Sequence, residues 1–329
     1  MPARVIVRLP NWLGDTVMAV PVLVAIRRGW PDAAVLAAGP WASVLSGQGL
    51  ADTLVTYPRT WRGRVASADL VRAFHGDLAV LLPNSLEAAL AAWYWGARRR
   101  AGVAADTRTL LLTDRVAPAP DAHQVDQYLR IVESLGLAAS GRIPELTPPA
   151  PDGDARGRIR GLLEATGGRP RVGIHLGAEY GASKLWPRRR VIEGCLALAK
   201  AGMTPVLLGA PRDASLSDAI ARAAGAASLV GKDDPALLPA LLTEIDALVA
   251  GDTGVAHLAA ALGTPVVALF GPTDARRTAP RGRVTSLTHP VPCAPCYLRT
   301  CPIEHPCLAG VTAAQVVDAV SAMLRRVAA

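Results

Sequence analysis

The sequence predicts an α/β protein built from two similar domains, each with a parallel sheet that helices cover on both faces. Short apolar runs alternate with helical patterns in both halves of the chain, which is typical of βαβ units. The length of 329 residues favours two domains. Residues 138–158 are dense in Pro and Gly and separate the halves as a linker does. We therefore expect domains at residues 1–150 and 151–329, with a ligand cleft between the carboxyl ends of their strands.

The first half supplies the first set of elements. Apolar runs rich in β-branched residues or Leu are separated by segments in which apolar residues recur every three or four positions. The predicted strands are residues 5–9, 34–38, 54–57 and 78–82, and the predicted helices are residues 17–28, 86–95 and 124–135.

The second half repeats the pattern more strongly. Each apolar run is followed by Gly and then by a helical stretch, as expected for a second α/β domain. The last helix carries Val316, Val320 and Leu324 on one face. The predicted strands are residues 172–176, 204–208, 247–250 and 266–270, and the last helix is residues 312–327.

Composition excludes whole-chain disorder and narrows the class of partner. Hydrophobic residues make up 51% of the chain, which is enough for packed cores. The formal net charge of +8 favours anionic partners, which could be phosphate, a membrane surface or nucleic acid. Nucleic acid is disfavoured because no RNP, helix-turn-helix or zinc-finger pattern is present. No apolar run has the length of a transmembrane helix, and no signal-peptide pattern precedes the first strand, so we expect a cytoplasmic location.

Two segments have features of metal sites, but neither is favoured as one. Residues 293–307 hold four of the five cysteines. They begin with C-x2-C spacing, but the rest fits no common zinc or iron–sulfur pattern, so reduced thiols in a Pro-bent loop are favoured. Residues 152–154 form a D-x-D pair that no strand holds rigid, which favours a solvated turn. We therefore expect no metal site.

The turn after the first strand carries Asn11, Trp12 and Asp15. It lacks the G-x-G-x-x-G pattern, so a dinucleotide fingerprint is absent. At the end of a strand, the carboxylate of Asp15 could act as a general base on a substrate hydroxyl, and its structural alternative is to cap the following helix. Asn11 and Trp12 could bind a polar partner or could serve only the loop.

The second domain opens with a loop suited to anions. A strand ends before Gly177, and small residues starting with Ala178 lead to a helix that Pro187 opens. Loop amides, the helix N-terminus and Lys184 predict an anion site, although the loop does not match the Walker A pattern. The alternative for Lys184 is a solvated cation, but its isolation in a lysine-poor chain favours a function.

The strongest signal follows the predicted strand at residues 247–250. Asp252 ends that strand, Thr253 and Gly254 form a tight turn, and a helix containing His257 follows. The first amides of this helix suit a diphosphate, His257 could add a donor, and Asp252 could accept sugar hydroxyls. The alternatives are a helix cap for Asp252 and a packed core position for His257. Asp213 follows another strand end, where it could bind ribose hydroxyls or cap the next helix.

Five short segments, taken in order, resemble glycosyltransferase family 9, the ADP-heptose:lipopolysaccharide heptosyltransferases, with the closer likeness to the heptosyltransferase II branch. Each segment alone is weak, but together they cover essentially the whole chain in the right order. They are residues 11–15 (NWLGD), 82–85 (LPNS), 177–187 (GAEYGASKLWP), 252–260 (DTGVAHLAA) and 270–273 (FGPT).

The resemblance implies a GT-B architecture, with two Rossmann-like domains that bind acceptor and donor respectively. It implies inverting transfer of heptose from ADP-L-glycero-D-manno-heptose to the inner core of lipopolysaccharide, without cofactor or metal. Asp15 matches the family's catalytic base, and Lys184 matches the lysine that neutralises the donor phosphates. The remaining donor-binding residues that we expect are Gly177, Ala178, Asp213, Asp252, Thr253, Gly254 and His257, and the acceptor-binding residues are Asn11, Trp12, Asn84 and Ser85.

The expected partners are an ADP-sugar donor and a phosphorylated, lipid-linked core oligosaccharide as acceptor, with no nucleic acid. Arg59, Arg62, Arg64, Arg72 and residues 98–100 could hold core phosphates or contact the anionic inner leaflet of the cytoplasmic membrane peripherally. The alternative is a solvated surface in an Arg-rich chain.

Three other functions stay open. A family 9 transferase could use another nucleotide sugar or another glycan acceptor. A sugar-nucleotide epimerase of the same architecture would isomerise a donor without any acceptor. A non-catalytic nucleotide-binding module would bind an ADP-sugar but would release no ADP when an acceptor is added.

Overall fold

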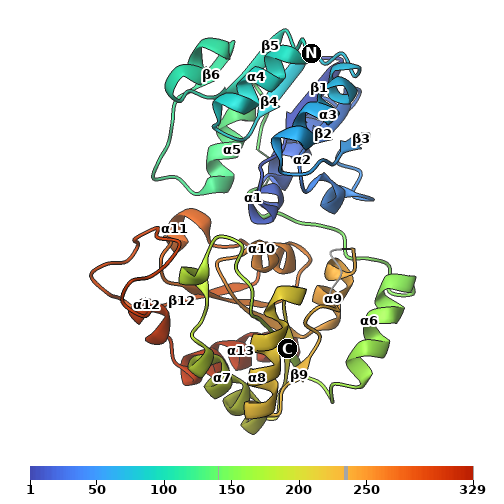
Figure 1. Ribbon diagram of the computed structural model, residues 1–329. Helices are drawn as coiled ribbons and strands as arrows, with labels where there is room; N and C mark the ends of the chain where they lie inside the picture. The colour runs from blue at the N-terminus through green and yellow to red at the C-terminus, as the bar shows by residue number, and fades with distance from the viewer. Residues whose placement is uncertain (140, 233–235, 329) are drawn as a thin grey trace. The chain divides into compact units, whose positions relative to one another are not determined.

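A computed structural model describes residues 1–139, 141–232 and 236–328. The chain divides into two compact units, Met1–Leu146 and Thr147–Ala329. Figure 1 shows the first unit in blue to green and the second in green to red. Each unit is built on its own parallel sheet, so the predicted class of two α/β units is confirmed.

The sheet of the first unit has six described strands in the order β3-β2-β1-β4-β5-β6. Every neighbouring pair is parallel, and β1, in the middle, is fully buried from Val5 to Arg8. The chain moves outward from β1 in one direction and then in the other, so the sheet is doubly wound. The strands are β1 (Arg4–Arg8), β2 (Ala34–Ala38), β3 (Thr53–Val55), β4 (Leu78–Leu81), β5 (Arg99–Val103) and β6 (Asp114–Val116).

Helices cover both faces of this sheet because right-handed crossovers place them on opposite sides when the winding direction reverses. On one face, Val71 of α3 and Ala89 of α4 pack with Ile6 and Leu81 of the strands. On the other face, α2 packs against α5. The helices are α1 (Leu13–Met18), α2 (Val20–Gly29), α3 (Trp61–Arg72), α4 (Leu86–Tyr94) and α5 (Gln124–Glu133), with short 3₁₀ turns η1 (Ala42–Leu45) and η2 (Asp106–Leu111).

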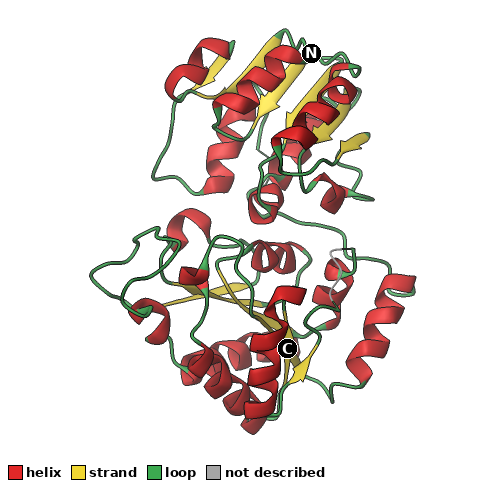
Figure 2. Ribbon diagram, in the orientation of Figure 1, coloured by secondary structure: helices red, strands yellow, loops and turns green. Residues whose placement is uncertain are grey.

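The second unit repeats the architecture, with strand order β12-β11-β10-β7-β8-β9 and parallel pairing throughout its described strands. The central strand β10 is apolar and completely buried, as expected for a parallel sheet covered on both faces. Figure 2 shows the strands enclosed by helices. The strands are β7 (Arg171–His175), β8 (Thr204–Leu208), β9 (Ala227–Ser228), β10 (Ala247–Gly251), β11 (Val266–Phe270) and β12 (Val284–Thr288).

The last helix closes the core of the second unit. Val316 and Val320 of α13 are fully buried against the sheet, as the apolar pattern predicts, and α13 also packs on α7. The remaining elements are α6 (Asp154–Glu164), α7 (Arg188–Lys200), α8 (Ala214–Ala224), α9 (Leu238–Glu244), α10 (Gly254–Ala261), α11 (Ala275–Thr278), α12 (Pro306–Ala309) and α13 (Ala313–Ala328), with 3₁₀ turns η3 (Ala182–Lys184) and η4 (Pro211–Asp213).

Two predicted boundaries are wrong for local reasons. The predicted helix at 17–28 is two helices, because the chain breaks at Ala19 and Pro21 opens α2 near its start. The predicted linker at 138–158 is too long, because α6 begins at Asp154 after Gly153 as its N-cap. Asp152 and Asp154 are exposed, but only the former lies in a turn.

Within the described residues, no helix combines the length and the apolar character needed to cross a bilayer.

Candidate functional site

A buried ion pair lies at the carboxyl end of β10 in the second unit. Asp252 follows β10 and is only 8% exposed. Its Oδ2 lies 2.6 Å from Nζ of Lys184, which also donates to the main-chain oxygen of Asp252 at 3.0 Å. The hydroxyl of Thr273, which follows β11, donates to the same Oδ2 at 2.7 Å. Three strand-end segments therefore meet at one carboxylate.

This carboxylate stays ionised. Burial opposes the charge, but His257 and Lys184 outweigh it and hold the pKa of Asp252 well below its usual range. Nε2 of His257 lies 3.9 Å from Oδ1. Because Oδ2 is taken up by Lys184 and Thr273, Asp252 anchors the lysine, a role that the sequence did not predict. The expected bond between Asp252 and a sugar hydroxyl stays a prediction.

The N-terminus of α10 opens beside this pair. Thr253 is the N-cap, but its side chain makes no capping hydrogen bond, and among the described residues its buried Oγ1 has no hydrogen-bond partner. The amides of the first helical turn cannot bond within the helix, and together with the helix dipole they favour a negative charge. His257, one turn along, is 4% exposed. Thr253, Gly254, His257 and Lys184 are thus brought together as the sequence predicts.

The loop that carries Lys184 is fixed from one side by the cysteine-rich segment. Ser183 donates its amide to the main-chain oxygen of Arg299 at 3.1 Å and its hydroxyl to that of Leu298 at 2.5 Å. The ring of Tyr180 contacts two cations, with Nζ of Lys184 at 4.7 Å and the guanidinium of Arg299 at 5.4 Å from its centre. Such cation–π contacts are attractive and help to hold Lys184 in place.

Gly181 allows this close approach, and its replacement is expected to disturb the lysine. Its φ is 155°, and an added Cβ would overlap the main-chain oxygen of Arg299. We expect Gly181→Ala to lower the free energy of unfolding by about 1–3 kcal/mol and to weaken binding of the anion that the sequence predicts at Lys184. Gly161→Ala, in open space on α6, is the control and should be neutral or slightly stabilising. Equal melting and ligand affinity of Gly181→Ala and the parent would contradict the fixed-loop account.

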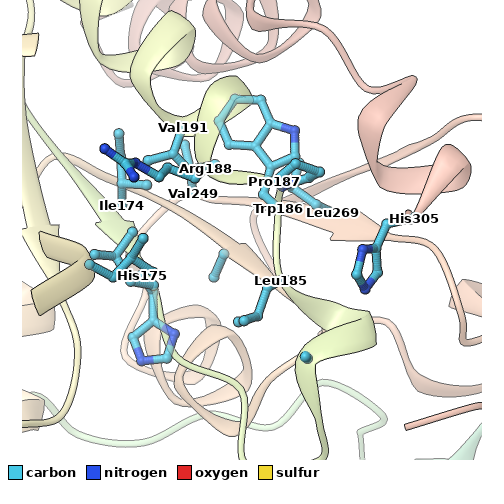
Figure 3. Close-up of a pocket in the computed structure, with 15 residues that line it drawn as sticks. Ile174, His175, Leu185, Trp186, Pro187, Arg188, Val191, Val249, Leu269 and His305 are labelled. Atoms are coloured by element: carbon cyan, nitrogen blue, oxygen red, sulfur yellow. The ribbon is translucent and has the colours of Figure 1, made fainter. Parts of the chain in front are cut away.

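A cavity of about 260 Å³ lies on the inner side of the same loop, lined by Ala182 and Leu185. Figure 3 shows the rings of His175 and His305 on two sides of it and Trp186 at its edge. Burial, with the charge of Arg212 adding, lowers the pKa of His175 to about 4, so this imidazole is neutral at physiological pH. The indole of Trp186 donates to Val311 at 3.1 Å and ties the loop to the core.

Asp213 uses one carboxylate oxygen locally. Oδ2 accepts from the amide of Ala210 at 2.9 Å, and so closes the η4 turn. Asp213 occupies the N-cap position of α8, but its side chain does not cap that helix. Gly177 and Gly209 border it closely, since a Cβ on either would lie 3.0 or 2.9 Å from Oδ2. Ala178 follows in the same half-buried strand-end loop.

In the first unit, Asp15 lies in the first turn of α1. The N-cap of this helix is Trp12, so the capping alternative for Asp15 is wrong. The hydroxyl of the buried Tyr128, on α5, donates to Oδ1 of Asp15 at 3.4 Å. Burial raises the pKa of Tyr128 well above its usual value and the charge of Asp15 adds to this, so the phenol remains a donor.

The other predicted residues of the first unit have identifiable partners. The amide oxygen of Asn11 accepts from the buried Arg8 at 2.9 Å. The guanidinium of Arg59 stacks over the ring of Trp12 at 3.9 Å. Ser85 caps α4 by accepting from the amide of Ala88 at 3.3 Å, and the neighbouring Asn84 is exposed. All four lie at the carboxyl ends of β1 and β4, the sheet edge that also carries Asp15.

Sequence reasoning missed three residues of these sites. Arg8 lies at the end of an apolar strand, and its charge in that position was the signal that could have identified it. Thr273 belongs to the FGPT segment at residues 270–273, but its hydrogen bond to Asp252 joins segments 21 residues apart. Tyr128 was part of a predicted helix, and no sequence pattern pairs it with Asp15.

The cysteine-rich segment holds free thiols. Cys293 is exposed, Cys296 and Cys301 are half-buried, and Cys307 is buried. Burial raises the pKa of the Cys307 thiol. In the described residues, no group of three or more His, Cys, Asp or Glu side chains is arranged to hold a metal ion.

The chain is similar to known proteins over most of its length. Residues 67–306 match the family model described as "Glycosyltransferase family 9 (heptosyltransferase)". The lipopolysaccharide heptosyltransferase 2 of Escherichia coli K12 is 26% identical over 84% of this chain and 85% of that protein. The lipooligosaccharide heptosyltransferase 2 of Haemophilus influenzae is 29% identical, and that match spans 62% of this chain and 63% of that protein.

The fold agrees with this assignment. The structure of Escherichia coli ADP-heptose lipopolysaccharide heptosyltransferase II has a TM-score of 0.82 at 24% identity and covers 99% of this chain and 100% of that one. The predicted GT-B fold class is therefore confirmed. Because the family model matches well over half of the sequence, the chain belongs to glycosyltransferase family 9.

Proposed function

We propose that this protein is an inverting glycosyltransferase that moves heptose from ADP-L-glycero-D-manno-heptose to the inner core of lipopolysaccharide. Family membership and the heptosyltransferase 2 relatives support the reaction class. The observation that carries the donor side is the ammonium of Lys184, held 2.6 Å from Asp252 beside the N-terminus of α10.

The donor diphosphate binds at this pair of positive groups. An ammonium has three N–H donors, and Lys184 spends two of them on Asp252, so one remains for a phosphate oxygen. The amides of Thr253 and Gly254 and the side chain of His257 supply further donors. Negative charge grows on ADP as the sugar leaves, and donors fixed before the reaction stabilise it without reorganisation. These groups take the place of a divalent cation in the proposed reaction.

The nucleoside lies along the strand-end loops of β7 and β8. Gly177 and Ala178 present backbone close to the ligand, as small residues allow. Asp213 accepts a ribose hydroxyl with Oδ1, since Oδ2 is bonded to Ala210.

The acceptor binds at the first unit. Asp15 takes the proton from the attacking hydroxyl as the oxygen reaches the anomeric carbon. The phenol of Tyr128 holds the carboxylate of Asp15 from the protein side. Asn11, Trp12, Asn84 and Ser85 contact the acceptor sugars at the same sheet edge. We further propose that the protein works in the cytoplasm at the inner face of the cytoplasmic membrane, because the acceptor is lipid-linked.

A donor panel tests the proposal. Only a true donor should stabilise the fold strongly, by about 2.7 kcal/mol at a hundred times its Kd. We expect ADP-heptose to raise Tm more than ADP-glucose, and UDP-glucose to leave it unchanged. Adding delipidated core oligosaccharide should then release ADP. Equal stabilisation by UDP-glucose, or isomerisation of the donor without acceptor, would instead support another sugar nucleotide or an epimerase.

A further inference from the structure

Helix α4 of the first unit carries its large apolar side chains on the outside. Ala88, Ala89 and Ala92 face the sheet and are fully buried. Leu90 and Trp93, on the opposite side, are 46% and 61% exposed. A helix that is apolar all round is normally covered on both sides. In the described part of the chain, the outer side of α4 is therefore exposed, although its apolar sequence is typical of a helix that is covered on both sides.

Exposed apolar side chains also occur on the elements that neighbour α4. Helices α3 and α4 lie side by side, since Oη of Tyr94 donates to Asp69 at 2.6 Å and Arg64 lies 3.1 Å from Glu87. On η2, which packs against α4, Leu110 is 81% exposed. We define the α3–α4 face as the exposed apolar residues Trp61, Val65, Leu86, Leu90, Trp93 and Leu110. Large apolar side chains that are exposed together on neighbouring elements are typical of an interaction site.

The charge around this face is positive. Arg62, Arg72 and Arg98 are exposed on or beside the two helices. The guanidinium of Arg62 lies 5.6 Å from the ring of Trp61. Of the acidic groups there, Glu87 is paired with Arg64, while Asp69 accepts from the neutral phenol of Tyr94 and keeps its charge. The face thus combines tryptophan and leucine with more arginine than acidic charge.

We infer that the α3–α4 face docks on the surface of a bilayer that contains anionic lipid. Tryptophan and leucine enter the boundary between headgroups and acyl chains, while arginine binds the lipid phosphates. Each basic residue near an anionic bilayer adds to the binding. Charge also argues against a second copy of the chain, because a two-fold contact through this face would bring two patches of the same positive charge together.

The position of the face suits the acceptor. Trp61 and Leu86 lie in the first turns of α3 and α4, which follow the carboxyl ends of β3 and β4. Asn84 and Ser85, which directly precede α4, belong to the same edge as Asp15. This use of the face rests on the proposed function, in which the acceptor is lipid-linked. Docking would hold the acceptor edge of the sheet at the membrane surface where such a substrate is presented.

Vesicle binding tests the inference. The parent protein should co-sediment with vesicles of phosphatidylethanolamine and phosphatidylglycerol, and only weakly with vesicles of phosphatidylcholine alone. The double variant Leu90→Gln/Trp93→Gln should partition at least about ten-fold more weakly, because two large apolar side chains no longer enter the interface. Leu196→Gln, at an equally exposed leucine on α7, is the control and should bind like the parent. Melting curves of all three should coincide, because the changed side chains are exposed.

Three readouts separate this inference from the proposed function. In the double variant, the melting shift with ADP-heptose and the turnover of a delipidated acceptor should persist, while turnover of the lipid-bearing acceptor in vesicles falls. Failure of the donor panel with intact vesicle binding would overturn the reaction and leave the surface standing. Equal vesicle binding by parent and double variant would overturn the surface. The surface would also be overturned if the double variant lost only self-association, as measured by sedimentation equilibrium. That result would assign the face to a second copy of the chain.

Discussion

Replacing Asp15 with alanine is expected to abolish sugar transfer while leaving donor affinity nearly unchanged. In the proposed reaction, Asp15 removes the proton of the acceptor hydroxyl, and a positioned general base contributes about 10²–10⁴ to the rate. Donor affinity should persist because the donor groups, from Gly177 to His257, belong to the second unit. The measurement is acceptor-dependent ADP release together with the Kd for ADP-heptose.

Two further variants separate the base from the surroundings of Asp15. Asp15→Asn keeps the shape and the acceptor oxygen for Tyr128 but removes the basicity, so it should be as inactive as the alanine variant. Tyr128→Phe removes the hydrogen bond at 3.4 Å and should retain most of the turnover. Near-normal turnover of Asp15→Asn would refute the assignment of the base.

Replacing Lys184 with alanine is expected to slow transfer at least roughly ten-fold and to weaken donor binding, on the scale of one lost donor to a developing anion. The change also leaves Asp252 buried without its cation. Breaking a buried ion pair in this way destabilises a fold by about 3–5 kcal/mol. A fall in Tm should therefore accompany the kinetic loss.

A double variant distinguishes the kinetic effect from the loss of stability. In Lys184→Met/Asp252→Asn, the uncompensated carboxylate is gone, while Thr273 and His257 can still bond to the amide. We expect Tm to recover most of its loss, while donor affinity and turnover remain low. If turnover returned together with Tm, Lys184 would have only a structural role.

Most of the fold could be predicted from local sequence patterns. Strands such as Ala34–Ala38 and Val266–Phe270 are buried on both faces, so their sequences are continuously apolar and easily identified. Strand β5 was not predicted, because it begins with Arg99 and Arg100 and so lacks a continuous apolar sequence. The side chains of these arginines bond to Asp114 and to main-chain oxygens at the end of the sheet. The strand character of β5 comes from pairing with β4, which no local pattern reports.

For the sites too, local patterns predicted some features, while others depend on partners that are distant in the sequence. Strand ends and small-residue turns indicated the positions of Asp15, Lys184 and Asp252. The use of the Asp252 carboxylate as an anchor could not be predicted, because it depends on Lys184, which is 68 residues away in the sequence. Likewise, the helix at 86–95 was predicted, but its apolar sequence does not tell that alanines face the sheet and Leu90 faces outward. Burial on a given face is decided by the neighbours that the fold supplies.

The most direct test of the central claim is a crystal structure of the protein with a non-transferable fluorinated ADP-heptose and a delipidated core acceptor. The account predicts that diphosphate oxygens accept from Nζ of Lys184 and from the amides of Thr253 and Gly254, with an acceptor hydroxyl bonded to the carboxylate of Asp15. A diphosphate bound away from the N-terminus of α10, or an acceptor bound away from Asp15, would contradict it.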